Sequence, residues 1–259
     1  MRFDKISSKD NEKIKLVLKL IRQAKQRETN RLFVIEGARL CQDAFKSGIV
    51  IKWLMFTETG IEKYKNYIDE ITDCTEGNYL LTDSVFDKIS DTENTQGVLC
   101  VCKMPDLDSK LNLSGRYAAV ENISNPANLG AISRTVEALG LDGLFLIGNN
   151  CDCYSTKALR ASMGSLFRLD IIPISYEDIE SLKQKGFKFI ASVVDKNANK
   201  VDKYQFNDGS ILIVGNEGNG VSQQLKNLCD DFVTIPINGK AESLNASAAA
   251  AILFWEFIK

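Results

Sequence analysis

The sequence predicts an α/β protein in two parts, a smaller one followed by a larger one with a mostly parallel β-sheet. Segments of strand length alternate with helical patterns along the chain, which is typical of strands joined by covering helices. The chain has 259 residues, of which 44% are hydrophobic, enough for one large domain or two moderate ones. An irregular polar stretch at 103–116 interrupts the alternation. We therefore expect a first domain at residues 1–105, a linker at 106–116 and a second domain at 117–259.

The first part begins with an amphipathic pattern at residues 11–28. This segment places Ile14, Leu18, Ile21 and Lys25 on one side of a helix, with basic residues around the rest. The pattern then predicts, in order, a strand at Arg31–Glu36, a helix at Ala38–Lys46, a strand at Ile49–Phe56, a helix at Ile61–Ile71, a strand at Tyr79–Leu81, a helix at Asp83–Ile89 and a strand at Gly97–Cys102. Together these elements make a small α/β unit.

The second part continues the alternation, and this order implies a parallel sheet covered on both faces. The expected strands are Tyr117–Ile123, Gly143–Ile147, Leu169–Ile174, Phe187–Val194, Ile211–Val214 and Phe232–Ile237. The expected helices are Pro126–Leu139, Ser155–Leu166, Tyr176–Lys185, Val221–Leu228 and Leu244–Ile258.

The composition excludes several kinds of chemistry. The chain has no histidine, so it lacks the usual general base at neutral pH, the Ser-His-Asp and Cys-His arrangements, and any zinc site that needs imidazole. The N-terminus has no apolar segment typical of a secretory signal, so we expect a cytoplasmic protein whose seven cysteines are reduced. The C-x-C pairs at Cys100/Cys102 and Cys151/Cys153 indicate core thiols, and we expect no metal.

Charge is distributed unevenly along the chain. Residues 1–55 hold 13 Lys and Arg against 6 Asp and Glu, whereas residues 56–259 hold 19 against 28. A basic segment on an acidic body indicates a polyanionic partner, although a solvated helix face explains such a run equally well. The longest apolar stretch, Ala246 to Ile258, is too short to span a bilayer and contains Glu256, so no membrane association is expected.

Three loops in the second part follow predicted strands and are rich in polar and small residues. They are NPANLGAISR at 125–134, GNEGNG at 215–220 and NGKAESLN at 238–245. Ligands of open parallel sheets bind outside the carboxyl ends of the strands, so we expect these loops to converge on a site.

The first of these loops combines a helix start with an exposed cation. Asn125 and Pro126 suit the cap and first turn of a helix. Leu129 and Ile132 belong to the buried face of that helix, which leaves Arg134 on the opposite side at 100° per residue. An exposed helical arginine is usually a solubilising residue, but this one lies close to the expected site.

The other two loops contain one carboxylate and two candidate caps. The glycines of 215–220 allow backbone amides to approach a ligand, but the pattern fits neither a dinucleotide fingerprint nor a P-loop. Glu217 among them is a site residue or a charge at a helix start. Ser243 and Asn245 both lie where a helix cap is expected, and the small residues of 246–251 behind them indicate close helix packing.

Three segments, in this order, resemble the signature motifs of the SpoU (TrmH-type) 2′-O-ribose RNA methyltransferases of the SPOUT class. They are ENISNPANLGAISRTVEALG, LIVGNEGNGVS and IPINGKAESLNASAAAAI. The resemblance spans residues 117–259, and the first 105 residues look like the smaller RNA-binding domain of the ribosomal-RNA members. It implies a parallel sheet with a trefoil knot, an exception to the rule against knots.

The resemblance also implies a cofactor and roles for individual residues. S-adenosylmethionine is the expected cofactor, and the expected cofactor-binding residues are Gly215, Asn216, Gly220, Ile235, Ile237 and Leu244. The residues matching the family's active site are Asn128, Arg134, Glu217, Ser243 and Asn245, and Arg31 and Arg39 of the basic segment are candidate RNA contacts. Arg134 matches the proposed activator of the ribose 2′-hydroxyl, either as a base or as a stabiliser of the developing alkoxide.

The function expected from this resemblance is 2′-O-methylation of RNA by a homodimer, with ribosomal RNA of the 23S type favoured as substrate. Two RNA-related alternatives stay open, a tRNA 2′-O-methyltransferase and a non-catalytic RNA-binding protein. A redox protein of the Rossmann class needs a glycine fingerprint after its first strand, and none is found at Ala118–Asn122. Transfer to a ribose hydroxyl requires neither metal nor histidine, in agreement with the composition.

Overall fold

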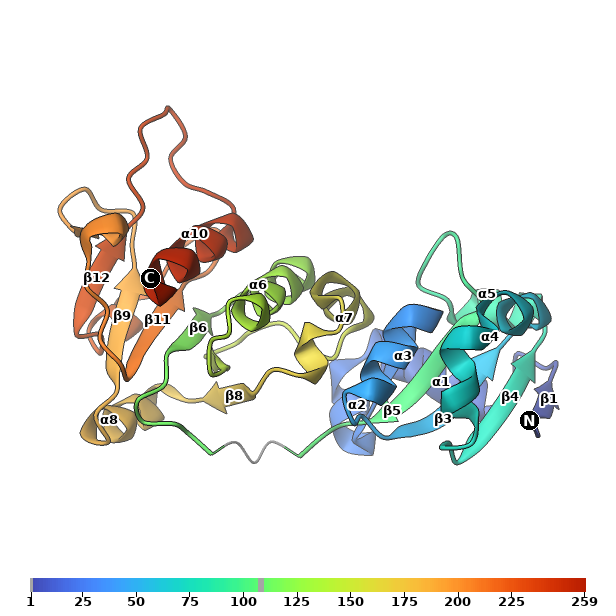
Figure 1. Cartoon of the computed structure of the whole chain (residues 1–259). Coiled ribbons are helices and arrows are strands. Elements are labelled where there is room, and N and C mark those ends of the chain that lie inside the picture. Colours follow the sequence, from blue (N-terminus) through green and yellow to red (C-terminus); the bar gives the residue numbers. More distant parts are fainter. Residues whose placement is uncertain (1, 107–109) are drawn as a thin grey trace. The chain divides into compact units, whose positions relative to one another are not determined.

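The computed structural model describes residues 2–106 and 110–259, which form two compact units (Figure 1). The first unit holds the described residues up to Asp106 together with Asp152–Phe167. The second holds the other described residues up to Cys151 together with Arg168–Lys259. Residues 107–109 of the expected linker lie outside the described residues. Among those described, no helix is long and apolar enough to cross a membrane.

The first unit contains a five-stranded mixed sheet in the order β1-β4-β3-β5-β2. Strands β1, β4 and β3 run parallel, and β5 is antiparallel to both β3 and β2. Its strands are β1 (Asp4–Ile6), β2 (Leu32–Glu36), β3 (Ile51–Phe56), β4 (Gly77–Leu81) and β5 (Val98–Lys103). Its helices are α1 (Glu12–Arg22), α2 (Ala24–Asn30), α3 (Ala38–Lys46), α4 (Glu58–Thr72), α5 (Asp83–Ile89), α7 (Thr156–Ser162) and the 3₁₀ turn η1 (Ser165–Phe167).

The single helix expected at residues 11–28 is wrong, because the chain breaks into α1 and α2 at Gln23. This residue is extended, with φ −132° and ψ 115°. The break brings the buried guanidinium of Arg27 onto the free carbonyls at the end of α1, where it donates to Leu20 O (2.5 Å) and Ile21 O (3.1 Å). Unpaired carbonyls at a helix end are costly to bury, so this arginine stabilises the break.

The buried face of α1 also differs from the expected one. Its buried side chains are Ile14, Val17 and Leu20, whereas Leu18 is partly exposed and Lys25 of α2 is exposed. Ile14 is one of the predicted positions, and Leu18 and Ile21 pack against the same core at the margin of this buried stripe, so Lys25 is the predicted position that faces solvent.

Segment Asp152–Phe167 packs in the core of the first unit. Phe33, which is fully buried on β2, has its ring centroid 4.9 Å from that of Tyr154 and 6.3 Å from that of Phe167. Sequence periodicity predicted the helix in this segment, but the order of elements alone does not say which sheet it covers.

The second unit confirms the predicted parallel sheet. Its seven strands lie in the order β10-β12-β9-β11-β6-β7-β8, and every pairing is parallel. The strands are β6 (Tyr117–Glu121), β7 (Leu144–Ile147), β8 (Ile171–Ile174), β9 (Lys188–Ser192), β10 (Asn199–Lys200), β11 (Ser210–Val214) and β12 (Asp231–Thr234). The helices are α6 (Pro126–Ala138), α8 (Tyr176–Gln184), α9 (Gln223–Lys226), α10 (Ala246–Ile258) and the 3₁₀ turn η2 (Val201–Lys203).

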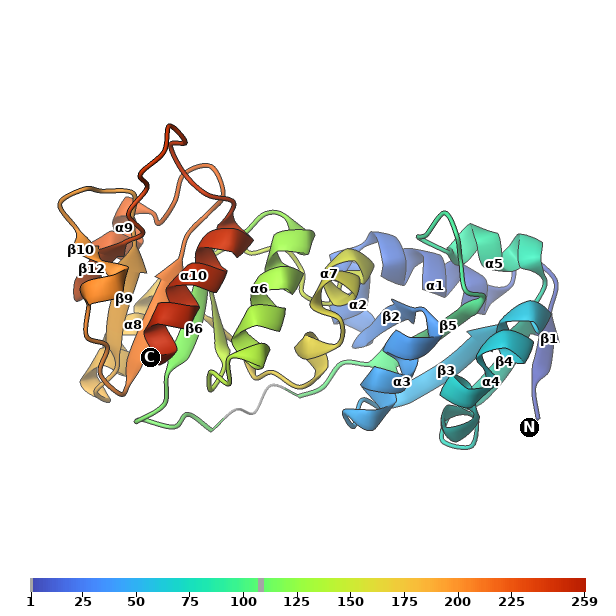
Figure 2. The same cartoon turned by 45° about the horizontal axis from the view of Figure 1, so that its top comes forward.

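Helices cover both faces of this sheet, as expected. Helices α6 and α10 lie side by side (Figures 1 and 2), and α10 also packs on β11. The other face of the sheet is covered by α8 and α9. There, side chains of the strands, among them Phe189 and Ile213, form one core with Ile179 and Leu182 of α8 and Leu225 of α9. Because helices cover both faces, a ligand site is expected at the edge formed by the carboxyl ends of the strands and the loops that follow them.

Two boundaries differ from prediction in ways that affect the site. Strand β12 ends at Thr234, so Ile235 and Ile237 lie in the loop that follows. Helix α10 begins at Ala246 with Asn245 as its cap, two residues later than expected.

The short elements β1, β10 and η2 have too few residues for periodicity to reveal them. The trefoil knot stays a prediction.

Substitution of Phe33 by alanine should destabilise the first unit strongly. The side chain is fully buried between two other aromatic rings, so its removal leaves a cavity that costs about 3–5 kcal/mol. Phe3→Ala is the matched control, because Phe3 is 39% exposed and should cost about 1 kcal/mol or less. Urea unfolding followed by far-UV circular dichroism measures both, and equal losses would contradict the packing described.

Candidate active site

Hydrogen bonds join the three polar loops at the carboxyl edge of the parallel sheet. Glu217, after β11, accepts from Asn128 Nδ2 (3.0 Å) and from the backbone N–H of Asn125 (3.1 Å). It also accepts from the backbone N–H and the hydroxyl of Ser124, at 3.2 and 3.0 Å. Asn245 Nδ2 donates to Asn128 Oδ1 (3.2 Å). The predicted convergence of the loops is therefore confirmed, and the Asn128 side chain connects all three.

Two asparagines cap the helices that begin at this edge. Asn125 accepts from Ala127 N (2.9 Å) through its side chain, and Pro126 occupies the first turn of α6. Asn245 caps α10 by accepting from Ser247 N (3.0 Å), while its amide nitrogen reaches Asn128. The capping interpretation of Asn245 is thus confirmed, and the nitrogen of the same amide bonds to Asn128, another predicted active-site residue.

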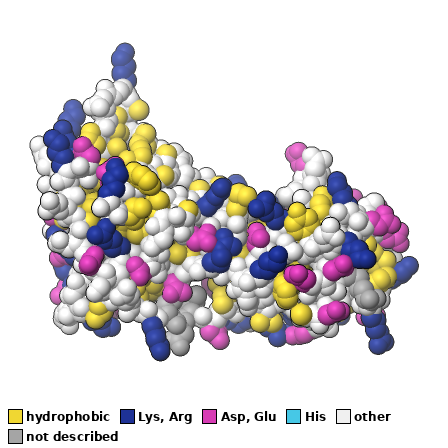
Figure 3. Space-filling model, viewed as in Figure 1, with side chains coloured by type: hydrophobic (Ala, Val, Ile, Leu, Met, Phe, Trp, Pro, Cys, Tyr) yellow, Lys and Arg dark blue, Asp and Glu magenta, His cyan; other side chains and the backbone are white. Residues whose placement is uncertain are grey.

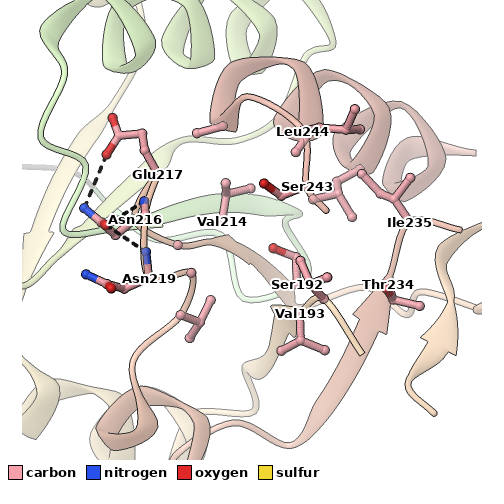
Figure 4. Close-up of a pocket in the computed structure, with 18 of the residues that line it drawn as sticks. Ser192, Val193, Val214, Asn216, Glu217, Asn219, Thr234, Ile235, Ser243 and Leu244 are labelled. Carbon is pink, nitrogen blue, oxygen red and sulfur yellow. Dashed lines mark hydrogen bonds between the residues drawn. The ribbon is translucent and has the colours of Figure 1, made fainter. Parts of the chain in front are cut away.

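The loop between β11 and α9 is folded tightly on itself. Asn216 Oδ1 accepts from the backbone N–H of Gly218 (2.9 Å) and of Asn219 (3.1 Å), as the dashed lines in Figure 4 show. Asn216 and Gly220 also pair through their backbones, at 3.0 and 2.9 Å. A Cβ on Gly215 would lie 2.2 Å from the carbonyl carbon of Gly220, so only glycine fits there.

A cavity of about 400 Å³ opens beside this loop (Figure 4). All six predicted cofactor-binding residues line it, namely Gly215, Asn216, Gly220, Ile235, Ile237 and Leu244. Glu217 and Ser243 of the predicted active-site set line it as well. Asn128 and Asn245 are not in its wall, but Asn128 bonds directly to Glu217.

Sequence reasoning missed several residues of the cavity wall. Ser192 ends β9 and is followed by Val193 and Val194, and Thr234 ends β12. Strand β9 pairs with both β11 and β12, so its carboxyl end must border the site. The available signal was this strand order, which a sequence without structure does not reveal.

Arg134 lies on the solvent side of α6. Its side chain is exposed, while Leu129, Ile132 and Val136 of the same helix are buried, in agreement with the predicted helical face. The helix that Asn125 and Glu217 fix at its start therefore determines where this guanidinium lies.

The hydrogen bonds to Glu217 keep its carboxylate ionised. Burial raises the pKa of this group, but donation by Asn128 and by the backbone N–H groups of Asn125 and Ser124 outweighs burial and lowers the pKa to about 2. A carboxylate with this pKa is a weak base at neutral pH. Its negative charge is instead a permanent feature of the cavity wall.

A second carboxylate, Glu121, was not predicted as a site residue. It is fully buried at the end of β6 and accepts from Ser222 N (2.7 Å), Ser222 Oγ (2.5 Å) and Tyr176 OH (2.8 Å). Burial and the bond to Glu121 raise the pKa of Tyr176, so the phenol stays a donor. Glu121 thus fixes the start of α9, at the far end of the glycine loop.

The two predicted RNA contacts, Arg31 and Arg39, lie in the first unit and are exposed. Arg31 has a left-handed backbone with φ 52° and donates to Pro105 O (2.8 Å) and Asp106 Oδ1 (3.1 Å). Arg39 lines a second cavity, in the first unit. Within residues 2–106 and 110–259, no cluster of three or more potential ligands to a metal is found, and the seven cysteines are free.

Two parts of the chain match described families. Residues 116–255 match the SpoU rRNA Methylase family, and residues 11–100 match the MRM3-like substrate binding domain. The first match covers more than half of the chain. The protein therefore belongs to the SpoU rRNA methylase family.

Individual relatives agree over nearly the whole length. The 23S rRNA (guanosine(2553)-2′-O)-methyltransferase RlmP of Bacillus subtilis is 33% identical over 252 residues, which cover 96% of this chain and 97% of that protein. The 23S rRNA (uridine(2479)-2′-O)-methyltransferase of Streptomyces viridochromogenes is 28% identical, and the match covers 88% of this chain and 82% of that protein. The AdoMet-bound rRNA methyltransferase from Sinorhizobium meliloti superposes with a TM-score of 0.85 at 27% identity, covering 98% and 97% of the two chains.

Replacing Glu217 by glutamine should make stability less dependent on pH. A carboxyl whose folded pKa is lowered from 4.5 to about 2 stabilises the fold at pH above 4.5, and this contribution is lost as the pH falls toward 2. Between these pH values the unfolding free energy should fall more steeply in the wild type than in Glu217→Gln. Urea unfolding at stepped pH measures the slopes.

Glu242→Gln is the control for this measurement, because Glu242 lines the same cavity but is exposed. Its stability should follow the wild-type pH curve. Equal slopes for Glu217→Gln and the wild type would show that the carboxylate is not held by the bonds described.

Proposed function

We propose that this protein transfers a methyl group from S-adenosylmethionine to a ribose 2′-hydroxyl of ribosomal RNA of the 23S type. The observation that supports this most directly is the cavity at the carboxyl edge of the parallel sheet, which brings together all six residues predicted to bind the cofactor. The printed activities of the relatives from Bacillus subtilis and Streptomyces viridochromogenes support the substrate.

The cavity suits S-adenosylmethionine in size and charge. Its volume of about 400 Å³ lies within the usual range for small-molecule sites, about 300–1,000 Å³. Val193, Ile235 and Leu253 offer apolar surface for a flat base. Glu217 and Glu242 add negative charge, which favours a ligand that carries a sulfonium and an ammonium group.

The chain's own residues then have distinct tasks in the transfer. When bound, S-adenosylmethionine supplies a methyl group on a positively charged sulfur. Glu217 holds the loops in register and does not remove the hydroxyl proton, since its pKa is about 2 and its oxygens accept five hydrogen bonds. Arg134 donates hydrogen bonds to the alkoxide that develops on the ribose as the 2′-hydroxyl proton passes to solvent water, because a guanidinium is a cationic donor to oxygen.

The first unit supplies affinity for the RNA. Its basic segment at residues 1–55 and the match of residues 11–100 to a substrate-binding domain support this role. We assign residues 1–105, together with Asp152–Phe167 of the same unit, to RNA binding and the rest of residues 117–259 to methyl transfer, with a trefoil knot in the latter. With ribosomal RNA as its substrate, the protein acts in the cytoplasm.

The protein acts as a homodimer that pairs through α10. Ile252 and Trp255 of this helix are 42% and 53% exposed, although both are large and apolar. Large exposed apolar groups on one helix are typical of a contact between subunits.

Gly215→Ala should abolish tight binding of S-adenosylmethionine. The added Cβ would lie 2.2 Å from Gly220 backbone, so the loop that lines the cavity must shift. Affinity should fall tenfold or more by isothermal titration calorimetry. Gly218→Ala is the matched control, because its Cβ would meet only Asn216 Oδ1 at 3.6 Å, and its affinity should stay within about twofold. Equal affinities for the two variants would contradict the assignment of the cavity.

Arg134→Ala should slow methyl transfer while leaving the fold and cofactor binding intact. The side chain is exposed, so stability should change by about 0.5 kcal/mol or less. The rate should fall about a hundredfold or more, since the group acts on the hydroxyl as it becomes a nucleophile. Arg134→Lys should not restore it fully, because an ammonium lacks the planar fork.

Single-turnover transfer of labelled methyl to unmodified 23S ribosomal RNA, followed by alkaline hydrolysis, measures this rate. A 2′-O-methyl group blocks hydrolysis at its own linkage, so an alkali-labile product would refute 2′-O transfer. Lys185→Ala, an exposed site directly after α8, is the control for general charge loss. Full activity in Arg134→Ala would remove this residue from the mechanism.

Multi-angle light scattering tests the dimer. The wild type should have twice the 28.8 kDa mass of one chain at micromolar concentration, and Trp255→Glu should shift it toward the single-chain mass. A wild-type mass of one chain would contradict the proposed pairing.

A further inference from the structure

A second cavity, of about 340 Å³, lies within the first unit and is built from two stretches of its chain. Its wall includes Arg39 and Asp43 of α3, Asn94 and Gln96 of the loop before β5, and Arg160 and Met163 at the end of α7. Elsewhere on the visible face of the first unit, Lys and Arg side chains are interspersed with acidic ones (Figure 3). The surface charge around the cavity therefore does not distinguish it from the rest of this face. Its shape and the polar residues of its wall do.

The deepest charged group of this cavity, Glu36, is already fully bonded. It is buried and accepts from the hydroxyls of Ser90 (2.5 Å), Thr92 (2.6 Å) and Thr95 (3.1 Å), and from the backbone N–H of Asp91 (2.9 Å). These donors satisfy both of its oxygens. Its charge is thus stabilised without an arginine in direct hydrogen bonding.

Arg160, by contrast, has fewer acceptors than its donors require. Its Nη2 donates to Asp91 Oδ2 (2.8 Å), but its buried Nη1 makes no hydrogen bond to any described residue and lies 3.8 Å from Glu36 Oε2. Arg39 is exposed in the same wall and forms no ion pair with the described residues. Two guanidinium groups in one cavity wall favour an anionic oxygen ligand, above all phosphate.

Other groups of the wall indicate that the ligand is more than a phosphate. The Asp43 carboxylate would repel a free anion but accepts hydrogen bonds from N–H groups. Gln96 accepts from Ala38 N (2.9 Å) through Oε1, which leaves its NH₂ group for a ligand acceptor. Leu40 and Met163 provide apolar surface, and Met163 is 48% exposed. Phosphate, a polar edge with N–H donors and an apolar face occur together in a nucleotide.

We propose that this cavity receives one unpaired nucleotide of the RNA substrate. Its phosphate lies between Arg39 and Arg160, and its base lies against Leu40 and Met163 with a polar edge toward Asp43. The nucleotide must be unpaired, because a base enters a concave site only when it has left the helical stack. This inference rests on the proposed function in that it takes RNA as the ligand.

Binding of the full chain to unmodified 23S ribosomal RNA, transcribed in vitro and fluorescently labelled, tests the cavity by anisotropy at several salt concentrations. Arg39→Ala should lower affinity about tenfold and reduce the salt slope by about one. Lys65→Ala, an exposed cation on α4 of the same unit but outside the basic segment at residues 1–55, is the control and should stay within about twofold. Equal losses for the two variants would overturn the proposal, because the charge alone would then explain binding.

A double-mutant cycle tests whether the two arginines share one phosphate. The loss in Arg39→Ala/Arg160→Ala should be clearly smaller than the product of the single losses. Independent losses would overturn the shared contact. Thermal unfolding checks the Arg160 variants, and Arg160→Lys, which keeps the charge, replaces alanine if Arg160→Ala does not fold.

Photo-crosslinking identifies the nucleotide itself. With p-benzoylphenylalanine in place of the exposed Asn94, primer extension should map the crosslink to one unpaired nucleotide. Crosslinks distributed along duplex segments would overturn the proposal. Neither RNA binding nor crosslinking requires methyl transfer, so the two proposals can fail separately. A single crosslink in the absence of methylation would refute only the proposed activity. Methylation that does not depend on Arg39 would refute only the role of the cavity.

Discussion

The carboxylate of Glu217 is the group on which the geometry of the methyltransferase site depends. It accepts hydrogen bonds from Ser124, Asn125 and Asn128, and Asn128 in turn accepts one from Asn245. Without that charge, the start of α6 and the start of α10 would have no common fixed point at the sheet edge. Charge-assisted bonds are stronger than neutral ones, so one ionised group orders three segments that lie far apart in the sequence.

A second buried carboxylate fixes the other end of the same loop. Glu121 holds Ser222 through the hydroxyl and the backbone, while Gly215 allows the loop to fold back within contact of Gly220. The cavity wall between these anchors is therefore rigid without any contribution from a ligand. Such preorganisation lowers the cost of ordering the site when cofactor and RNA bind.

Local periodicity predicted the parallel sheet and the buried face of α6, and the resemblance to the family motifs predicted the cavity residues of the glycine loop. Sequence reasoning missed Ser192, Val193 and Thr234, which line the cavity only because β9 lies between β11 and β12. It also missed the break at Gln23, since the stabilising contact of Arg27 forms after the chain has turned. Strand order and long-range capping are decided by tertiary contacts, which local patterns do not contain.

Stability and chemistry are assigned to different groups of polar residues in this protein. Glu36 and Glu121 are buried, and neutral donors satisfy their oxygens, so they stabilise the fold and are unavailable to a ligand. Arg39 and Arg134 are exposed on helices whose opposite faces are buried, so they are accessible to a polyanion without exposing the core. An enzyme without histidine must move or stabilise charge with groups that do not titrate near neutral pH. A guanidinium fixed by a rigid helix start satisfies this requirement, because its position rather than its protonation state determines when it acts.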